Sequence, residues 1–142
     1  MFNGQVTTFI GFADGASRYT LNISLASWVL YSPTGDLVSS WGTCLGPSTN
    51  NITEYHAVIG LLTKSLANDV REIRVYLDSE LVVHQLNQFY TIHNPILLHT
   101  FRRVRILERY FEQVSYQHIQ RQLNVVANSL ENFILDWYLS HN

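Results

Sequence analysis

The sequence predicts a single α/β domain, residues 1–142, built on a five-stranded mixed sheet with helices on both faces. Its 142 residues and 46% hydrophobic content suit one domain with a sizeable core. The first 45 residues contain three segments rich in β-forming side chains. The remainder alternates amphipathic helical segments with two short apolar segments, which is typical of β-α-β units. We therefore expect three antiparallel strands followed by parallel ones.

Turn residues separate the three N-terminal strands. Residues 7–13 form a nearly continuous apolar run, which indicates a strand buried on both faces. Residues 25–31 and 37–45 flank the segment 32–36, whose proline and glycine are typical of a turn. These two strands are expected to form a hairpin, and Gly46 and Pro47 to end it.

Helices dominate the rest of the chain. Asn50 or Asn51 is expected to cap a helix that runs to about Asn68. A strand over 73–77 and a short helix over 79–86 follow, and the connection 87–95 leads to a helix opened by Pro95. A strand over 114–119 and a helix over 125–139 complete the order. Apolar residues recur at helical spacing in the three long helices: Ile52, Tyr55, Ile59, Leu62 and Leu66; Leu97, Phe101, Val104, Leu107 and Phe111; Val126, Leu130, Phe133 and Trp137.

Composition excludes several classes of protein. A formal net charge of -2 gives no support to nucleic-acid binding by the whole chain, so such binding needs a local patch. Cys44 is the only cysteine, which excludes an internal disulfide framework or cysteine-based zinc site. No apolar run approaches the roughly 20 residues that span a bilayer, and residues 1–6 lack a signal-peptide layout. We expect an intracellular protein of the cytoplasm or nucleus with no membrane partner.

Polar residues stand at the ends of predicted strands and the starts of predicted helices. Asp14 follows the first strand and Asp78 follows the fourth. Glu54 lies in the first turn of the first long helix, and Asn128 lies near the start of the last helix. Such positions can converge on one crevice of a mixed sheet. Neighbouring carboxylates repel one another, and Mg²⁺, which prefers oxygen ligands, would remove that penalty.

Four motifs carry a resemblance to a known family. They are D-G-A-S from Asp14, T-N-N-I-T-E-Y from Thr49, L-D-S-E-L-V from Leu77 and H-I-Q-R-Q-L-N-V-V-A-N from His118. In this order, over residues 7–137, they resemble type 1 ribonuclease H. The details are most similar to the ribonuclease H domains of plant gypsy-type retrotransposon polyproteins. Each motif alone is a weak signal, and the ordered set is a strong one.

The resemblance implies a Mg²⁺-dependent endonuclease that cuts the RNA strand of an RNA–DNA hybrid with two metal ions. It implies that Asp14 bridges both ions, that Glu54, Asp78 and Asn128 complete their ligands, and that Mn²⁺ can substitute. Substrate contacts are implied for one further set of residues: Gly15, Ala16, Ser17, Asn50 and Asn51. His118 is implied to help the product leave, and the reverse transcriptase domain of the same polyprotein is an implied partner.

The sequence departs from the family pattern at three places. Asn128 stands where the family usually has aspartate, so the cluster would hold three negative charges rather than four, and we expect weaker binding of the second ion and slower turnover. The segment 18–24 lacks the glycines that commonly follow D-G-x-S, and the connection 87–95 lacks a basic protrusion. The isolated domain is therefore expected to bind a hybrid weakly.

Structural interpretations of the same residues remain open. Asp14 could be a turn residue, Glu54 could close a capping box with Asn51, and Asp78 could cap a helix. His118 could be a polar residue at a strand end. One group of three arginines shares a face of the Pro95 helix, either solvated or contacting phosphate or a partner domain: Arg102, Arg105 and Arg109.

Three functions are therefore considered. The first is the ribonuclease H, and the second is a catalytically impaired hybrid-binding or structural module, because Asn128 has no charge. The third is a nuclease or transposase with the same fold that acts on DNA. The T-N-N-I-T-E motif, which suits contact with RNA in the minor groove, disfavours the third function.

Overall fold

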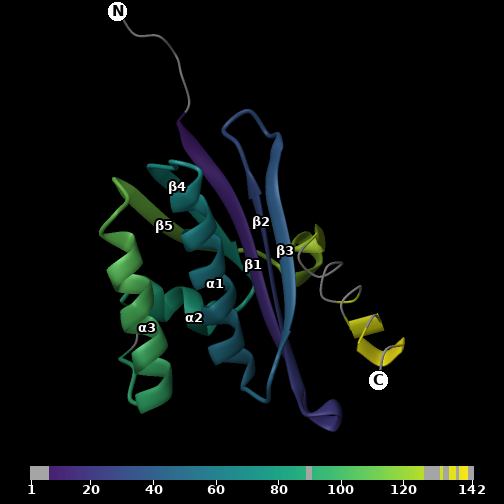
Figure 1. Cartoon of the computed structure of the whole chain (residues 1–142). Coiled ribbons are helices and arrows are strands. Elements are labelled where there is room, and N and C mark those ends of the chain that lie inside the picture. The colour runs from purple at the N-terminus through teal and green to yellow at the C-terminus, as the bar shows by residue number, and fades with distance from the viewer. Residues whose placement is uncertain (1–6, 89–90, 127–131, 133–134, 137, 141–142) are drawn as a thin grey trace, which may run out of the picture.

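The protein forms one five-stranded mixed sheet in the order β3-β2-β1-β4-β5 (Figure 1). The computed structural model describes residues 7–88, 91–126, 132, 135–136 and 138–140. Along the chain the elements are β1 (Thr8–Arg18), the 3₁₀ helix η1 (Tyr19–Leu21), β2 (Ile23–Tyr31), β3 (Leu37–Leu45), α1 (Asn50–Ala67), β4 (Glu72–Leu77), α2 (Glu80–Leu86), α3 (Pro95–Glu108), β5 (Gln113–His118) and the 3₁₀ helix η2 (Arg121–Leu123). β1, β2 and β3 pair antiparallel, whereas β4 pairs parallel with β1 and β5. The predicted sheet is thereby confirmed.

Both faces of the sheet are covered. Figure 1 shows α1 and α3 on one side and the described helical residues after η2 on the other. Every residue of β2 from Ile23 to Leu30 is buried, as a strand covered on both faces requires. On the second face, Phe12 and Tyr31 border a cavity with the segment 123–126. Three apolar positions expected in the last helix lie outside the described residues: Leu130, Phe133 and Trp137.

β1 is longer than predicted, and this extension positions the site. The prediction ended the strand at Ala13, but β1 continues to Arg18. The pairing with β4 stops at Ala13–Leu77, whereas the pairing with β2 continues to Arg18–Ile23. The prediction followed the run of apolar side chains, which stops before Asp14. The backbone hydrogen bonds between β1 and β2 do not depend on apolar side chains, so the strand continues past that point. Asp14 therefore lies inside a strand, just past the end of its parallel neighbour.

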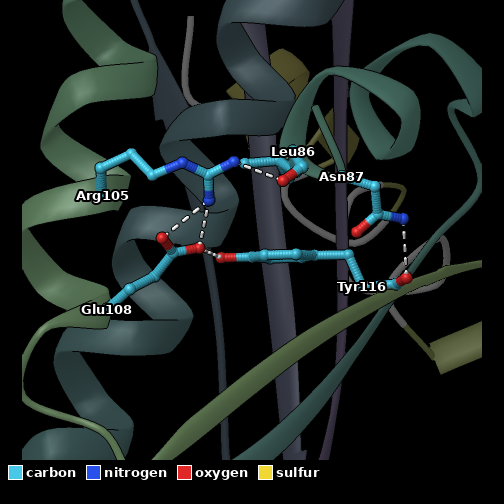
Figure 2. Close-up of polar contacts among 5 residues, drawn as sticks. All are labelled: Leu86, Asn87, Arg105, Glu108 and Tyr116. Carbon is cyan, nitrogen blue, oxygen red and sulfur yellow. Dashed lines mark hydrogen bonds and ion pairs between the residues drawn. The ribbon is translucent and has the colours of Figure 1, made fainter. Parts of the chain in front are cut away.

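A polar network fastens α3 to the end of α2 and to β5 (Figure 2). Arg105 Nη1 lies 2.7 and 2.6 Å from the two carboxylate oxygens of Glu108, and Arg105 Nη2 donates to the Leu86 carbonyl. The Tyr116 hydroxyl donates to Glu108 at 2.6 Å, and the Asn87 amide donates to the Tyr116 carbonyl at 3.2 Å. Burial, and then the Glu108 charge, raise the pKa of Tyr116, which stays a hydrogen-bond donor.

The network corrects the expectation for the arginine face of α3. Arg102 and Arg109 are exposed, as predicted for that face. Arg105 instead stacks on the Phe101 ring, 4.5 Å from its centroid, and is held by Glu108. Helical spacing alone could not reveal the Leu86 carbonyl and the Phe101 ring that receive this guanidinium. Arg105 is therefore a structural residue in this fold.

Among the described residues, none of the helices combines the length and the apolar character needed to cross a bilayer.

Candidate metal centre

Three acidic side chains from three different elements meet at the end of the parallel sheet. Ligand oxygens of Asp14 in β1, Glu54 in α1 and Asp78 after β4 lie within 4.8 Å of one another. Asp14 is 1% exposed and Glu54 is 3% exposed, whereas Asp78 is half-buried. Among the described residues they are the one group of three acidic, histidine or cysteine side chains with this spacing. The predicted convergence of these carboxylates is therefore observed.

The start of α1 directs Glu54 toward the sheet. The Thr49 hydroxyl caps the helix by accepting the Ile52 backbone N–H at 3.2 Å, so the expected caps Asn50 and Asn51 are wrong by one or two residues. Glu54 does not close a capping box with Asn51, because its Oε1 accepts the Ser79 backbone N–H at 3.3 Å. That bond ties α1 to the residue after Asp78.

Asp78 does not cap α2, although the sequence left that role open. The Ser79 hydroxyl caps α2 by accepting the Val82 N–H at 3.3 Å, so α2 begins at Glu80. Asp78 Oδ2 instead accepts a hydrogen bond from Asn124 Nδ2 at 3.3 Å. The carboxylate therefore belongs to the cluster and not to the helix terminus.

Asp14 is not a turn residue, because it pairs with Ser27 inside the β1–β2 ladder. Its Oδ1 accepts the Gly15 backbone N–H at 3.0 Å. Because Asp14 lies inside a paired strand, the backbone that carries its carboxylate is held rigidly.

Burial and repulsion make the cluster costly without a cation. Burial, followed by the charges of Asp78 and Asp14, raises the pKa of Glu54 well above its usual range. The Ser79 N–H and the Arg121 guanidinium lower this pKa only in part. Closely spaced carboxylate oxygens with an excess of negative charge fit Mg²⁺ or Mn²⁺, which bind hard oxygen ligands.

We expect Glu54→Gln to raise the free energy of unfolding of the metal-free protein by about 1–3 kcal/mol at about pH 8. Folding raises the pKa of Glu54, so wild-type stability is highest below the usual glutamate range and falls as the pH rises through the folded-state value. Glutamine keeps the acceptor oxygen for Ser79 without the charge. Urea unfolding in EDTA from about pH 5 to about pH 8 measures this difference. Identical pH profiles for the two proteins would contradict the proposed repulsion.

The residues expected to contact substrate lie in β1 directly after Asp14 and at the start of α1. The Ser17 backbone N–H donates to Asn50 Oδ1 at 2.6 Å, and the Ser17 hydroxyl donates to the Ser48 carbonyl. Asn50 is exposed and Asn51 is half-buried. Because its oxygen is held by Ser17, Asn50 presents its amide NH₂ as the remaining donor group. Gly15 and Ala16 are buried.

Gly15 permits the close approach of β1 to α1. A Cβ atom added at Gly15 would lie 2.5 Å from the Thr53 carbonyl carbon and 2.7 Å from Glu54 Cα, and would also clash with Glu54 N. All three atoms belong to the α1 backbone, so no side chain can move aside. The absence of a side chain here therefore sets the distance between Asp14 and Glu54.

The remaining predicted site residues are Asn128 and His118. Asn128 lies outside the described residues. His118 is exposed at the end of β5, paired with Leu77, and does not belong to the acidic group. Its role in product release stays a prediction.

Sequence reasoning missed Asn124, which is 1% exposed and donates to Asp78 and to the Ala13 carbonyl. Its position four residues before Asn128 in the fourth motif was the available signal.

Comparisons with known proteins give one consistent family. A family profile described as "Reverse transcriptase-like" matches residues 12–133. Ribonuclease HI of Halobacterium salinarum is 35% identical over 123 residues, covering 87% of this chain and 62% of that protein. A bifunctional protein of Mycobacterium tuberculosis is 30% identical over 65% of this chain, which spans 25% of that protein. The chain thus spans less than two thirds of the length of these curated relatives.

Solved structures share the fold. The crystal structure of ribonuclease H1 from Halobacterium salinarum superposes with a TM-score of 0.85 at 34% identity, covering 91% of this chain and 98% of that one. LC11 ribonuclease H1, solved in complex with an RNA/DNA hybrid, gives a TM-score of 0.84 at 27% identity, covering 92% and 99%. The protease-reverse transcriptase of prototype foamy virus gives 0.70 at 16% identity, covering 89% of this chain and 20% of that one, a likeness of fold alone.

Proposed function

Because the chain belongs to the reverse transcriptase-like, type 1 ribonuclease H family, we propose that it hydrolyses the RNA strand of RNA–DNA hybrids with divalent metal ions. The observation that carries the proposal is the meeting of Asp14, Glu54 and Asp78 within 4.8 Å. Such a cluster costs stability unless cations bind it, and metal-assisted phosphodiester hydrolysis is the chemistry that uses it. The related LC11 enzyme was solved on an RNA/DNA hybrid, which supports the substrate.

The three carboxylates would hold two Mg²⁺ ions, with Mn²⁺ able to substitute. Asp14 in β1, Glu54 in α1 and Asp78 after β4 would hold them, and the family resemblance implies that Asp14 would be the ligand that both ions share. When bound, the ions would supply an activated water and offset charge on the phosphate and the leaving 3′ oxygen. The fixed backbone of β1 and the Ser79 bond to Glu54 keep the ligands in place before any metal arrives.

Residues beside the cluster would recognise the hybrid. Asn50, held by Ser17, and the neighbouring Asn51 would donate to sugar or base edges in the minor groove, where the 2′-hydroxyl separates RNA from DNA. Gly15 and Ala16 would act through the backbone, since both are buried. His118, exposed at the end of β5, would assist product release.

A cleavage assay tests the proposal. The protein is incubated with a labelled RNA–DNA hybrid, and separately with duplex DNA, in Mg²⁺, Mn²⁺ or EDTA. We expect cleavage of the RNA strand with either metal and none in EDTA. Hybrid binding without cleavage under both metals would support the alternative of an impaired hybrid-binding module, which Asn128 favours. Faster cleavage of duplex DNA than of hybrid would overturn the substrate.

Asn128→Asp is expected to raise the cleavage rate at limiting Mg²⁺ by about 10-fold, because a fourth carboxylate strengthens binding of the second ion. Asn132→Asp is the matched control, since it adds the same charge at an exposed residue four positions later in the sequence. The measurement is the initial rate against Mg²⁺ concentration. An equal or lower rate in Asn128→Asp, with the fold intact, would count against metal ligation at this position.

We further propose that the domain belongs to a retroelement polyprotein and works beside its reverse transcriptase domain inside the cell. The "Reverse transcriptase-like" family description supports this context, and the foamy virus protein carries the same fold within a longer chain. A gypsy-type plant element remains the proposed origin. Sequencing the genomic DNA on both sides tests the proposal, since it predicts reverse transcriptase motifs in the same reading frame.

A further inference from the structure

We propose that Asn124 is a positioning residue that holds the Asp78 carboxylate in the geometry needed to bind metal, an inference that rests on the proposed metal-dependent function. Asn124 is an uncharged residue outside the predicted ligand set. It is nevertheless almost fully buried at the acidic cluster, with 1% of its surface exposed. Its amide joins the backbone next to Asp14 in β1 to the side chain of Asp78 after β4.

The contacts of the Asn124 amide nitrogen define this role. Nδ2 donates to the Ala13 carbonyl at 3.1 Å and to Asp78 Oδ2 at 3.3 Å. A carboxamide NH₂ has two N–H bonds, so these acceptors use its full donor capacity. Ala13 directly precedes Asp14, and Asp78 directly follows β4. One nitrogen atom therefore spans from the backbone beside one ligand to the side chain of another.

The bridge stands where the sheet stops holding the two strands together. The β1–β4 ladder ends at the Ala13–Leu77 pair, and Asn124 joins the chains one residue beyond it. Two backbone hydrogen bonds secure the segment that carries Asn124. The Ile119 N–H donates to the Leu77 carbonyl at 2.9 Å, and the Asn124 N–H donates to the Arg121 carbonyl at 3.0 Å. Asn124 therefore reaches Asp78 from a segment that is anchored to the same strand.

Asparagine suits this position chemically. An N–H bond to a carboxylate is charge-assisted, and it fixes one oxygen of Asp78 without adding a charge to the cluster. Without this donor, the half-buried Asp78 could rotate away from the repelling charges of Asp14 and Glu54. Groups that orient metal ligands typically change metal affinity or activity about 10- to 100-fold when they are removed.

The test compares Asn124→Ala with Asn87→Ala. Asn87 also donates a side-chain N–H to a backbone carbonyl, that of Tyr116 at 3.2 Å, but it lies outside the acidic cluster. Free Mn²⁺, measured by electron paramagnetic resonance in titrations without nucleic acid, gives the dissociation constant. We expect Asn124→Ala to raise the Mn²⁺ dissociation constant about 10-fold or more, and Asn87→Ala to leave this constant unchanged. If Asn124→Ala does not fold, Asn124→Leu, which has a similar size and no donor, carries the same comparison.

A double-mutant cycle with Asp78→Ala, which removes the acceptor of the Asn124 bond, identifies the residue through which Asn124 acts. In the Asp78→Ala background, Asn124→Ala should change the Mn²⁺ dissociation constant by less than about 2-fold, because its effect passes through the Asp78 carboxylate. Additive effects of the two substitutions would overturn the inference, as would a wild-type dissociation constant in Asn124→Ala. A wild-type protein that binds no Mn²⁺ and cleaves no hybrid would overturn the proposed function instead, so the two failures are distinct.

Discussion

Asp78→Asn is expected to reduce hybrid cleavage at least about 10³-fold with either Mg²⁺ or Mn²⁺, while the protein stays folded. The substitution removes one of three carboxylates whose ligand oxygens lie within 4.8 Å of one another. The amide oxygen of the new asparagine can still accept the hydrogen bond from Asn124, and Ser79 still caps α2. The loss therefore reports the charge of the ligand and not the architecture around it.

The control for this result is Glu80→Gln. Glu80 lies two residues after Asp78, has a side chain that is 71% exposed, and faces His84 at 3.9 Å. It loses the same charge outside the cluster, so its single-turnover cleavage rate should stay within about 2-fold of wild type, as for most exposed positions. Comparable losses in both variants would mean that general surface charge, and not metal ligation, controls the rate.

Gly15→Ala is expected to lower the free energy of unfolding by about 1–3 kcal/mol and to reduce cleavage about 100-fold. The added methyl group would meet the backbone of Thr53 and Glu54, so β1 and α1 must separate. Their separation moves Asp14 away from Glu54, and a displacement of about 1 Å in a catalytic site can cost 10²-fold in rate. Urea unfolding and the single-turnover cleavage rate measure the two effects separately.

Gly46→Ala is the matched control, because a Cβ atom at Gly46 would meet no atom within 4 Å. Gly46 lies in the connection between β3 and α1. It should leave both stability and rate near wild type. A Gly15→Ala protein with wild-type activity would show that the site tolerates a wider spacing than the close packing implies.

The acidic cluster could be predicted from sequence because its signals are local. Asp78 directly follows an apolar strand, Glu54 opens an amphipathic helix, and both stand in motifs whose order matches a family. The distance between the carboxylates was not local information, since it depends on the parallel pairing of β1 with β4 and on the missing side chain at Gly15.

Other features escaped prediction for the same physical reason. The continuation of β1 past Asp14 depends on backbone pairing with β2, which leaves no apolar pattern. The direction of the Arg105 side chain depends on the Leu86 carbonyl at the end of α2 and on the Glu108 carboxylate in α3. Asn124 became recognisable only when the fold brought it against Ala13 and Asp78. Helix starts shifted by one or two residues, because several polar residues competed for each cap.

The network in Figure 2 has a consequence for the connection between α2 and α3. Arg105 holds the Leu86 carbonyl at the end of α2, and Asn87 is tied to β5 through the Tyr116 carbonyl. The α2 end of the connection is therefore anchored independently of the length of the connection, and Asn94 caps α3 at the other end. Longer loops add closure entropy only slowly. The connection is therefore a suitable insertion point: a cationic hairpin placed there would add positive charge and leave the acidic cluster in place.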